Sequence, residues 1–306
     1  MNKTQISLDR KRAAMTEAFV KAVETAGKWL PDWICTTPRN FLTGKAYRGI
    51  NSVMLPLRAM VEGWETPLYA GKGQIKEAGG RIKEGQMNKA SWVFFWGSFE
   101  KEYTDGVTGE KTKRKIWFPK AFQVWNVCQI EGVKPERIKG LTTETVSGAE
   151  RDEAAEALLR GYMRAEGIGF AHADTTPCYI PMLDAIRMPR PESFDGTNPY
   201  YNAMAHEAAH STGHSTRLDR EIMNNHGDHR YSKEELVAQL AAAFIRADLG
   251  LTAEREEARD AAYLKSWLDA MRADPSMLFD AAGDADKAAR YIREKAGVET
   301  PEAVEA

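Results

Sequence analysis

Apolar positions in the first third of the chain predict helices separated by turn-rich segments. Residues 5–28 carry apolar side chains at helical spacing and predict an amphipathic helix. Residues 31–49 are rich in proline, glycine and asparagine and predict turns. The apolar run at residues 50–61 predicts a buried helix capped by Asn51, and residues 69–80 predict a weaker helix that ends at a glycine pair.

The hydrophobic pattern then changes to one that is typical of strands. Residues 90–99 and 115–127 are rich in aromatic and β-branched side chains, which favour an extended backbone. A charged turn that contains Asp105 and Gly106 separates the two runs. We therefore predict a long β-hairpin, followed by a linker over residues 134–147.

The second part of the chain has a mostly helical pattern. Its predicted helices span residues 149–166, 198–210, 232–249, 254–273 and 285–295. Residues 178–188 alternate partly and predict a strand, and Pro181 favours the edge of a sheet for it. The 232–249 segment is apolar nearly all round, so we expect a buried helix with Ser232 as its N-cap. The acidic last ten residues are expected to fray.

Charge divides the 306-residue chain into two unlike parts. Residues 1–140 contain 24 Lys and Arg against 14 Asp and Glu, whereas residues 141–306 contain 18 against 30. Seven of the eight tryptophans also lie in the first part. The length allows two domains, and opposite charge suggests a different partner for each. We therefore predict one domain at 1–140 and a second at 141–306.

Cysteine usage and the lack of long apolar runs predict a soluble protein of the cytoplasm. Cys35, Cys128 and Cys178 lie far apart and form no C-x-x-C pair, which argues against a disulfide framework. The N-terminal residues contain no apolar signal core, and no stretch of about 18 apolar residues could cross a membrane. We expect no membrane partner.

The string His206-Glu207-Ala208-Ala209-His210 has the pattern H-E-x-x-H and lies in the predicted 198–210 helix. Residues four apart share one helix face, so His206 and His210 can bind one metal ion while Glu207 reaches a metal-bound water. Zinc lowers the pKa of such a water to about 7, and a carboxylate can then take its proton. The pattern predicts a zinc hydrolase site with Glu207 as general base. The alternative is two surface histidines without a ligand role.

A catalytic zinc site needs a third protein ligand, and the sequence leaves several candidates. Glu235 lies in the buried 232–249 helix, where a carboxylate is costly unless it is paired or bound to a cation. Its neighbour Glu234 is the alternative to Glu235. The remaining candidates are His214, His226 and His229.

Each carboxylate also has an interpretation that needs no metal. Ser232 followed by Glu235 forms a capping-box pattern, which would explain one carboxylate of the pair but not both. Gln239, one turn after Glu235, could donate a hydrogen bond to that carboxylate while it binds the metal. His172 has no partner at ligand spacing and is interpreted as structural.

Substrate could approach along the predicted edge strand at residues 178–188. An extended peptide can add to a sheet edge by main-chain hydrogen bonds, so a peptide or protein substrate is expected there. An ordinary sheet edge without a substrate role is the alternative.

The basic first part combines cations with aromatic residues, as in proteins that bind single-stranded nucleic acid. Lys45, Tyr47 and Arg48 place a ring between two cations on a loop. A second basic cluster, before the second strand, contains Lys113, Arg114 and Lys115. These six residues predict a site for single-stranded nucleic acid, and the alternative is an ordinary solvated basic face. Most tryptophans are instead expected to fill the core of the domain.

Several strings of the sequence resemble ArdC-type antirestriction proteins. In the first part these are LTGKAYRGIN at 42–51, WVFFW at 92–96 and FQVWNVCQIEG at 122–132. In the second part they are IRMP at 186–189, YYNAMAHEAAHSTGH at 200–214 and YSKEELVAQLAAAF at 231–244. The strings follow the family's order along nearly the whole chain.

The resemblance implies an α+β fold of two domains. The N-terminal α+β domain would bind single-stranded DNA, and the C-terminal domain would be a mostly helical, zincin-like metallopeptidase with a small sheet. The resemblance assigns His206 and His210 as metal ligands, Glu207 as general base and the Glu234-Glu235 pair as the source of the third ligand. Gln239 departs from the family, whose helix usually carries a glutamate there.

The leading hypothesis is an antirestriction protein that protects incoming plasmid or phage DNA from host restriction. It would bind single-stranded DNA and carry one zinc ion, or another divalent metal, in a peptidase site. The alternative hypothesis is a DNA-binding shield with a structural or inactive metal site. A nuclease that uses the metal is a third hypothesis.

Overall fold

A computed structural model describes residues 3–26, 34, 36–104, 111–139, 148–220, 222, 229–251 and 261–304. Several sequence predictions therefore lie wholly or partly outside the described residues. They concern the helix end at 27–28, the turn residues 31–33 and 35, the turn at 105–110, the linker at 140–147, the helix residues 254–260, the terminal residues 305–306 and the candidate ligand His226.

The first part of the chain joins two helices to a four-stranded sheet. Helices α1 (Lys3–Ala26) and α2 (Ile50–Glu62) pack on each other, and α2 also packs on β4. The strands follow the order β1-β2-β5-β4. Their bounds are β1 (Arg39–Asn40), β2 (Leu68–Gly71), β4 (Ser91–Thr104) and β5 (Lys111–Asn126).

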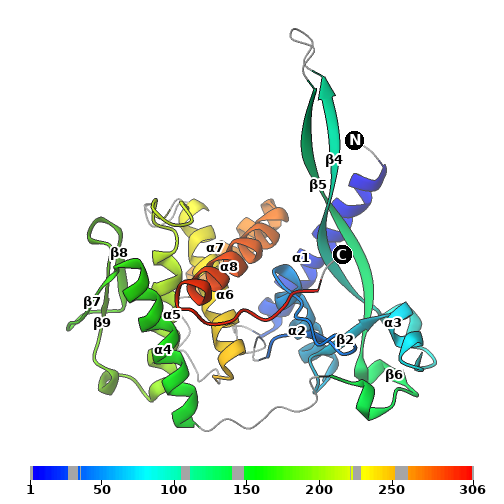
Figure 1. Ribbon diagram of the computed structural model, residues 1–306, viewed down its shortest axis with the longest axis horizontal. Coiled ribbons are helices and arrows are strands. Elements are labelled where there is room, and N and C mark those ends of the chain that lie inside the picture. The colour runs from blue at the N-terminus through cyan, green and yellow to red at the C-terminus, as the bar shows by residue number, and fades with distance from the viewer. Residues whose placement is uncertain are drawn as a thin grey trace.

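The predicted hairpin is present and is longer than its hydrophobic pattern suggested. Strands β4 and β5 pair antiparallel from Ser91 opposite Val124 to Thr104 opposite Lys111. The hairpin projects away from the rest of the molecule (Figure 1).

Short elements complete this part. They are α3 (Lys72–Glu77), η2 (Met87–Lys89), η3 (Val127–Gln129), η4 (Pro135–Arg137) and a two-stranded sheet of β3 (Arg81–Ile82) and β6 (Ile130–Glu131).

Two predictions for the first part were wrong in detail. Gly49, with φ 59°, precedes α2 as its cap. Asn51 instead bonds the Phe94 backbone, accepting from its N–H and donating to its C=O, both at 2.8 Å. The predicted 69–80 helix is split between β2 and α3, because Tyr69 pairs with Asn126 of β5. In both cases a long-range partner replaced the local preference.

The second part is a helical layer with a three-stranded sheet. Its helices are α4 (Gly148–Glu166), α5 (Thr197–Ser211), α6 (His229–Leu249), α7 (Ala261–Ala273) and α8 (Ser276–Lys295). Its strands, in the order β7-β9-β8, are β7 (Gly169–His172), β8 (Cys178–Ile180) and β9 (Ala185–Met188). Short 3₁₀ turns η5 (Pro181–Leu183) and η6 (Pro191–Ser193) complete it.

Two predictions for the second part are also corrected. The 178–188 segment is not one strand, because Pro181 opens the η5 turn between β8 and β9. Strand β8 nevertheless lies at the sheet edge and pairs with β9. Helix α6 begins at His229, so Ser232 lies inside it and cannot be its N-cap.

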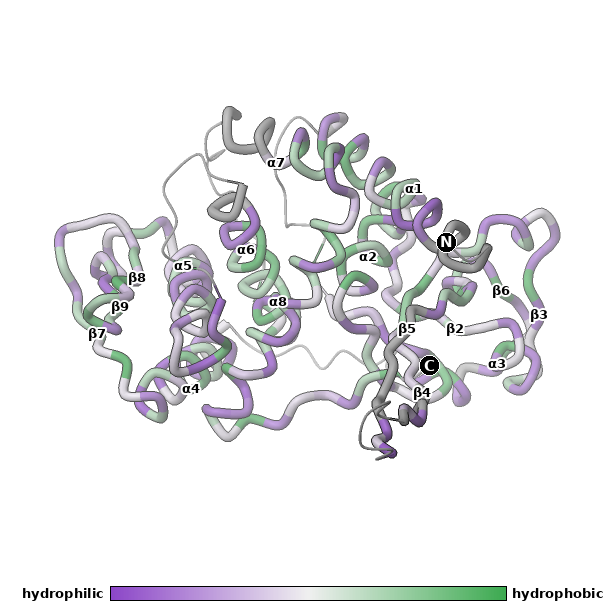
Figure 2. Tube along the Cα trace, turned by 90° about the horizontal axis from the view of Figure 1, so that it is seen from above, coloured by the Kyte–Doolittle hydropathy of each residue, from purple (hydrophilic) through white to green (hydrophobic). Residues whose placement is uncertain are grey.

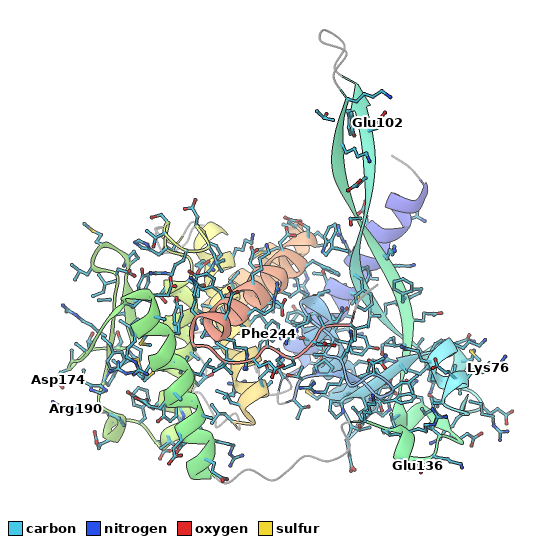
Figure 3. The ribbon with its side chains drawn as sticks, viewed as in Figure 1. Lys76, Glu102, Glu136, Asp174, Arg190 and Phe244 are labelled. Carbon is cyan, nitrogen blue, oxygen red and sulfur yellow. The ribbon has the colours of Figure 1, made fainter. Side chains whose placement is uncertain are left out.

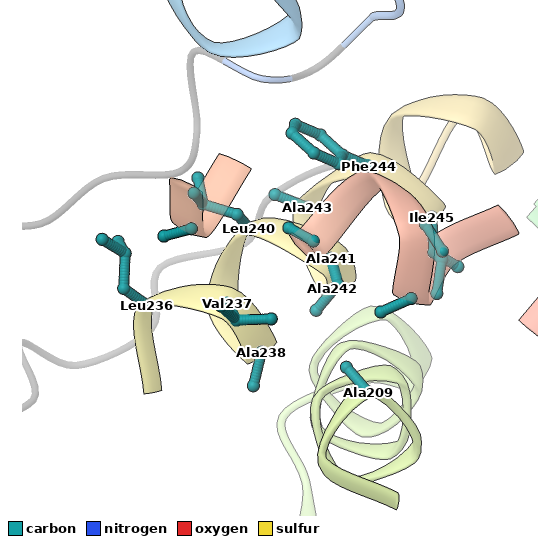
Figure 4. Close-up of a cluster of buried hydrophobic side chains, with 14 of the residues drawn as sticks. Ala209, Leu236, Val237, Ala238, Leu240, Ala241, Ala242, Ala243, Phe244 and Ile245 are labelled. Atoms are coloured by element: carbon teal, nitrogen blue, oxygen red, sulfur yellow. The ribbon is translucent and has the colours of Figure 1, made fainter. Parts of the chain in front are cut away.

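Alanines let the helices of the second part approach closely. Ala209 of α5 faces Ala238 and Ala242 of α6, and all three side chains are buried (Figure 4). Helix α6 also packs on α8, which leaves it surrounded by protein, as its apolar pattern predicted. The position of α6 against α5 decides the geometry of the metal centre described below.

The two parts share one hydrophobic core. A single cluster of buried side chains includes Phe19 of α1, Phe94 of β4 and Leu278 of α8. Figure 2 shows hydrophobic residues along α2, α6 and α8, in the middle of the molecule. Helix α1 also packs on α7, so the first part is joined to the second over a broad contact.

The C-terminal segment returns to the first part instead of fraying. The Ala46 N–H donates to the Glu302 carbonyl at 2.7 Å, and the Val304 N–H donates to the Ala46 carbonyl at 2.8 Å. This segment runs from α8 toward the base of the hairpin (Figure 1). Among the described residues, no helix is long and apolar enough to span a lipid bilayer.

Candidate metal centre

Three predicted ligands converge where α5 passes α6. His206 Nε2 and His210 Nε2 lie 3.1 Å apart. Glu235 contributes one carboxylate oxygen 3.6 Å from His206 Nε2 and the other 3.2 Å from His210 Nε2. Within the described part of the chain, these three residues form a group whose ligand atoms all lie within 4.8 Å of one another.

The donor set fits a tetrahedral divalent ion. Zinc bonds of about 2.0–2.2 Å to nitrogen and oxygen place neighbouring donors roughly 3.3 Å apart, close to the three distances in this centre. The set leaves one tetrahedral position for water, as in catalytic sites. His206 is buried and His210 and Glu235 are partly buried, so packing limits the movement of all three ligands.

Glu234 contacts one of the ligand histidines and is not itself part of the ligand set. Its Oε1 lies 3.2 Å from Nδ1 of His210, the ring nitrogen that faces away from the ligand cluster. Arg220 holds the same carboxylate in a bidentate pair, with distances of 2.8 and 2.9 Å. Carboxylates that hold the second nitrogen of a ligand histidine fix its ring and raise its basicity. The geometry therefore favours Glu235 over Glu234 as third ligand.

Burial and hydrogen bonding shift the pKa values of Glu234 and Glu235 in opposite directions. Burial raises the pKa of Glu234, but hydrogen bonds from Arg220 and His210 hold that pKa below its ordinary value. Burial likewise raises the pKa of Glu235, and the bonds from His206 and His210 lower it more strongly. Both groups are therefore carboxylates at neutral pH, the form that binds a cation.

Gly213 gives Arg220 the space it needs after α5. A Cβ at this position would lie 3.1 Å from Arg220 Nη2 and 2.4 Å from a methyl group of Ile222. Arg220 also donates to the Ala209 carbonyl and to Thr212 Oγ1, both at 2.8 Å. The small residue in the S-T-G-H string thus allows the loop to fold back on α5.

Glu207 faces the edge strand of the small sheet. Its Oε2 accepts the backbone N–H of Tyr179 in β8 at 2.7 Å. This bond fixes the carboxylate beside the metal centre and uses the central N–H of the three-residue strand. The predicted edge is therefore present, but one of its main-chain donors is already bonded.

Sequence reasoning missed an ionic network under β8. Arg217 bonds both oxygens of Asp184, and its guanidinium and that carboxylate both bond the Tyr179 hydroxyl. Arg217 also donates to the Ser211 carbonyl at 2.7 Å, which links the network to the end of α5. Asp184 has φ 44°, a left-handed conformation that aspartate tolerates, but no motif signals the pairing.

The other candidate ligands lie away from the centre. His214 bonds Thr216 Oγ1 at 2.9 Å, and the side chain of His229 lies outside the described residues. His172 bonds the Tyr200 hydroxyl at 3.1 Å, in line with its structural interpretation. Among the described residues, Glu235 pairs with His206 and His210 and not with Gln239, and Glu234 and Arg220 hold the His210 ring instead.

Two predicted DNA contacts are built into the protein interior. The Tyr47 ring is 1% exposed and packs against Tyr69 and Phe95, which leaves no ring face for a base. Arg48 donates to the Pro301 carbonyl at 2.9 Å and lies 3.7 Å from the Asp286 carboxylate. The stacking role of Tyr47 therefore does not fit this arrangement, and Arg48 is engaged with groups of the protein itself.

The remaining predicted DNA contacts lie at the surface or outside the described side chains. Lys45 is half-exposed and pairs with Glu302 at 3.1 Å. Lys113 is exposed on β5, opposite Glu102, which lies near the hairpin tip (Figure 3). The side chains of Arg114 and Lys115 lie outside the described set.

Comparison with known proteins agrees with both halves of this description. The family described as the N-terminal domain of the anti-restriction factor ArdC matches residues 9–125, and the zincin-like metallopeptidase family matches residues 153–284. The crystal structure of the antirestriction ArdC protein from plasmid R388, in metal-free form, superposes with a TM-score of 0.73 at 31% identity, covering 94% of this chain and 99% of that one. The chain belongs to the ArdC family of antirestriction proteins. Its α+β fold and its zincin-like domain are thereby confirmed.

Further relatives extend the ArdC comparison. The Mn(II)-bound structure of the R388 protein has a TM-score of 0.72 at 31% identity, covering 93% of this chain and 97% of that one. The uncharacterized protein y4eC of Sinorhizobium fredii (strain NBRC 101917 / NGR234) is 30% identical over 287 residues, or 91% of this chain and 90% of its own. The Escherichia coli DNA primase TraC is 30% identical over 283 residues, which are 86% of this chain but 25% of TraC.

The ArdC relatives bear on the metal as well. The zincin-like domain and the Mn(II)-bound neighbour indicate a divalent metal for the family, consistent with the donor set of His206, His210 and Glu235.

Proposed function

We propose that this antirestriction protein binds single-stranded DNA through its first part and hydrolyses peptide bonds at a zinc centre in its second part. The observation that carries the peptidase proposal is the convergence of His206 Nε2, His210 Nε2 and the Glu235 carboxylate beside Glu207. Its proposed role is to protect plasmid or phage DNA from restriction when that DNA enters the cytoplasm.

The chemistry follows from the residues around the centre. Zinc held by His206, His210 and Glu235 would supply a bound water with a pKa near 7 and a positive charge for the scissile carbonyl. Glu207 accepts the proton of the attacking water and returns it to the leaving amine. Glu234 and Arg220 keep the His210 ring in its orientation.

The substrate is proposed to be a peptide or protein that lies extended beside β8. The Tyr179 N–H, which now donates to Glu207, is a main-chain donor on this edge. A substrate carbonyl that takes over this N–H would release the Glu207 carboxylate for proton transfer. Strand addition would thereby couple substrate binding to the availability of the base.

The proposed DNA binding is supported by the basic charge of residues 1–140 and by the ArdC N-terminal family match. Among the residues predicted from sequence, the hairpin cations Lys113, Arg114 and Lys115 remain candidate contacts. Lys45 remains accessible beside Glu302. Binding of this kind weakens steeply with salt, because each phosphate contact releases counterions.

Glu207→Gln tests the peptidase proposal. The amide oxygen can still accept the Tyr179 N–H, but the side chain can no longer accept a proton. We expect unchanged metal content and thermal unfolding, with cleavage of casein as a test substrate reduced by at least a hundredfold. Cleavage at the parent rate would refute the role of Glu207.

The same variant separates the peptidase from a simple DNA shield. Protection of incoming unmodified plasmid DNA is measured in cells that carry a restriction enzyme. If Glu207→Gln protects as well as the parent, coating of DNA is the function and hydrolysis is not required. If protection is lost while single-stranded DNA binding is retained, the peptidase is required.

A further inference from the structure

A cleft of about 500 Å³ lies between the base of the hairpin and α8. Its walls come from β4, the start of α2 and α8, and Arg12 of α1 reaches it from the side. Ligand pockets typically have volumes of about 300–1,000 Å³, so the space suits a small organic group. Lys233 of α6, next to Glu234, also lines the cleft, but His206, His210 and Glu235 do not, and nothing in the peptidase chemistry uses it.

Aromatic side chains line one side of the cleft. Trp96 of β4 is 61% exposed, so its ring offers a face to solvent. Deeper in the cleft, Phe94 meets Phe279 of α8 edge to face, with ring centroids 5.3 Å apart. An exposed tryptophan beside a buried apolar floor is a suitable platform for a planar group.

Arg12 lies where a phosphate would follow such a planar group. Its guanidinium is 5.8 Å from the Trp96 ring and 5.5 Å from the Phe279 ring. Its Nε is buried without a hydrogen-bond partner within the described part of the chain, and its ion pair with Asp9 is long, at 4.0 Å. A buried guanidinium nitrogen that lacks an acceptor favours an anionic ligand.

Two exposed cations of α8 line the cleft, each paired with a carboxylate that lines it as well. Lys287 and Arg290 of α8 are exposed, whereas their partners Asp284 and Asp286 are mostly buried, at distances of 3.0 and 3.1 Å. Asp280 lines the cleft as well, and its carboxylate accepts from Ser276 Oγ at 3.5 Å. A fully acidic peptide would be repelled by Asp280, whereas a nucleotide presents a neutral base there.

We propose that this cleft binds one nucleotide of a single strand, with the base stacked on Trp96 and a phosphate at Arg12. The proposal rests on the proposed binding of single-stranded DNA and assigns it a specific site. It also places α8, from the second part of the chain, in contact with the nucleic acid.

Phe122 provides a matched control on the same hairpin. It is 43% exposed and lies opposite Val93. Successive residues of a strand point to opposite faces, so Phe122 lies on the face away from Phe94 and Trp96. Its ring therefore does not line the cleft, although it is an accessible aromatic group close by.

The first experiment measures binding of fluorescein-labelled oligo(dT) to the full chain by anisotropy. We expect Trp96→Ala to weaken binding by roughly tenfold or more, because stacking on one aromatic ring contributes about that factor. Trp96→Phe should keep most of the affinity, and Phe122→Ala should stay within about twofold of the parent. Thermal unfolding of each variant confirms that the fold is kept.

The second experiment compares Arg12→Gln with Arg10→Gln, which removes an exposed cation from the same helix outside the cleft. Loss of one phosphate contact reduces the slope of log affinity against log salt by about 0.7 for a single strand. We expect this reduction for Arg12→Gln and a smaller one for Arg10→Gln. Equal slopes for the two variants would overturn the phosphate role of Arg12.

The outcomes separate this proposal from the wider one. If the parent chain does not bind oligo(dT), both proposals fail. If the parent binds and neither Trp96→Ala nor Arg12→Gln changes affinity or slope, the cleft is not the site, while DNA binding stands. A loss confined to Phe122→Ala moves the site to the opposite face. Displacement of oligo(dT) by polyglutamate at lower concentration than by unlabelled oligo(dT) identifies an acidic peptide as the ligand instead.

Discussion

The metal centre and the loop at residues 43–49 bury charged groups in opposite ways. At the centre, two imidazole nitrogens and a carboxylate oxygen lie within 4.8 Å of one another, with Nε2 of His206 and Nε2 of His210 3.1 Å apart. In the loop, Arg48 meets Asp286 at 3.7 Å, Asp248 at 4.0 Å and the Pro301 carbonyl at 2.9 Å.

The difference shows how a ligand site can be told from a structural ion cluster. The centre gathers three atoms that can bind one cation, whereas the loop cluster already balances its charges with Arg48 and Arg293. The loop cluster therefore joins the first part of the chain to α6 and α8. Four sets of variants test whether each group binds a ligand or stabilises the fold.

His206→Ala should have the largest effect, because it removes one of the converging donors. We expect bound metal to fall from about one ion per chain to nearly none, with loss of any hydrolysis. His214→Ala is the control, since His214 bonds Thr216 outside the centre. Metal analysis by mass spectrometry measures both variants, and equal metal content in them would remove His206 from the ligand set.

Glu235→Gln and Glu234→Gln test which carboxylate is the ligand. Loss of the Glu234 charge should weaken metal affinity by about 10–100-fold, because only the orientation and basicity of His210 change. Loss of the Glu235 charge should weaken it further, since an anionic ligand becomes a neutral amide. Competition with a metal indicator gives both affinities. The reverse order would make Glu234 the ligand.

Arg48→Ala and Lys45→Ala compare two cations of one loop. Removing Arg48 leaves Asp248 and Asp286 with one cation each, Arg293 and Arg290, and should lower the free energy of unfolding by up to about 3 kcal/mol. Lys45 pairs with the exposed Glu302, so its loss should cost less than about 1 kcal/mol. Urea unfolding of both variants measures the difference. Equal, small effects would show that Arg48 has no structural role.

Asp184→Asn should have the smallest effect and a defined pH dependence. Burial raises the pKa of Asp184, but bonds from Arg217 and Tyr179 hold it below the ordinary value of 3.8. The stabilisation is therefore present above about pH 4 and is lost as the pH falls through the lowered pKa. At pH 7 the variant should be about 1–2 kcal/mol less stable, and the gap should narrow below pH 4.

Asparagine suits this test because it tolerates the left-handed backbone of Asp184 as well as aspartate does. Unfolding by urea at several pH values measures the gap between parent and variant. A gap that stays constant down to pH 3 would show that the Asp184 charge does not contribute.

Local features of the sequence were sufficient for several elements and for part of the site. The aromatic, β-branched runs predicted the β4–β5 hairpin, and the i, i+4 spacing placed His206 and His210 on one helix face. These patterns act between residues that are close along the chain, so their geometry depends little on the rest of the fold.

Contacts between distant residues decided the remainder. Which of Glu234 and Glu235 faces the histidines depends on how α6 packs on α5, and the pairing of Tyr69 with Asn126 made a strand where the local pattern favoured helix. Tyr47 and Arg48 look like surface ligands in the sequence, but Tyr47 is buried against Tyr69 and Phe95, and Arg48 bonds the Pro301 carbonyl of the C-terminal segment. Residue type and spacing fix what a side chain can do, while packing between remote segments fixes whether it meets a ligand, another side chain or solvent.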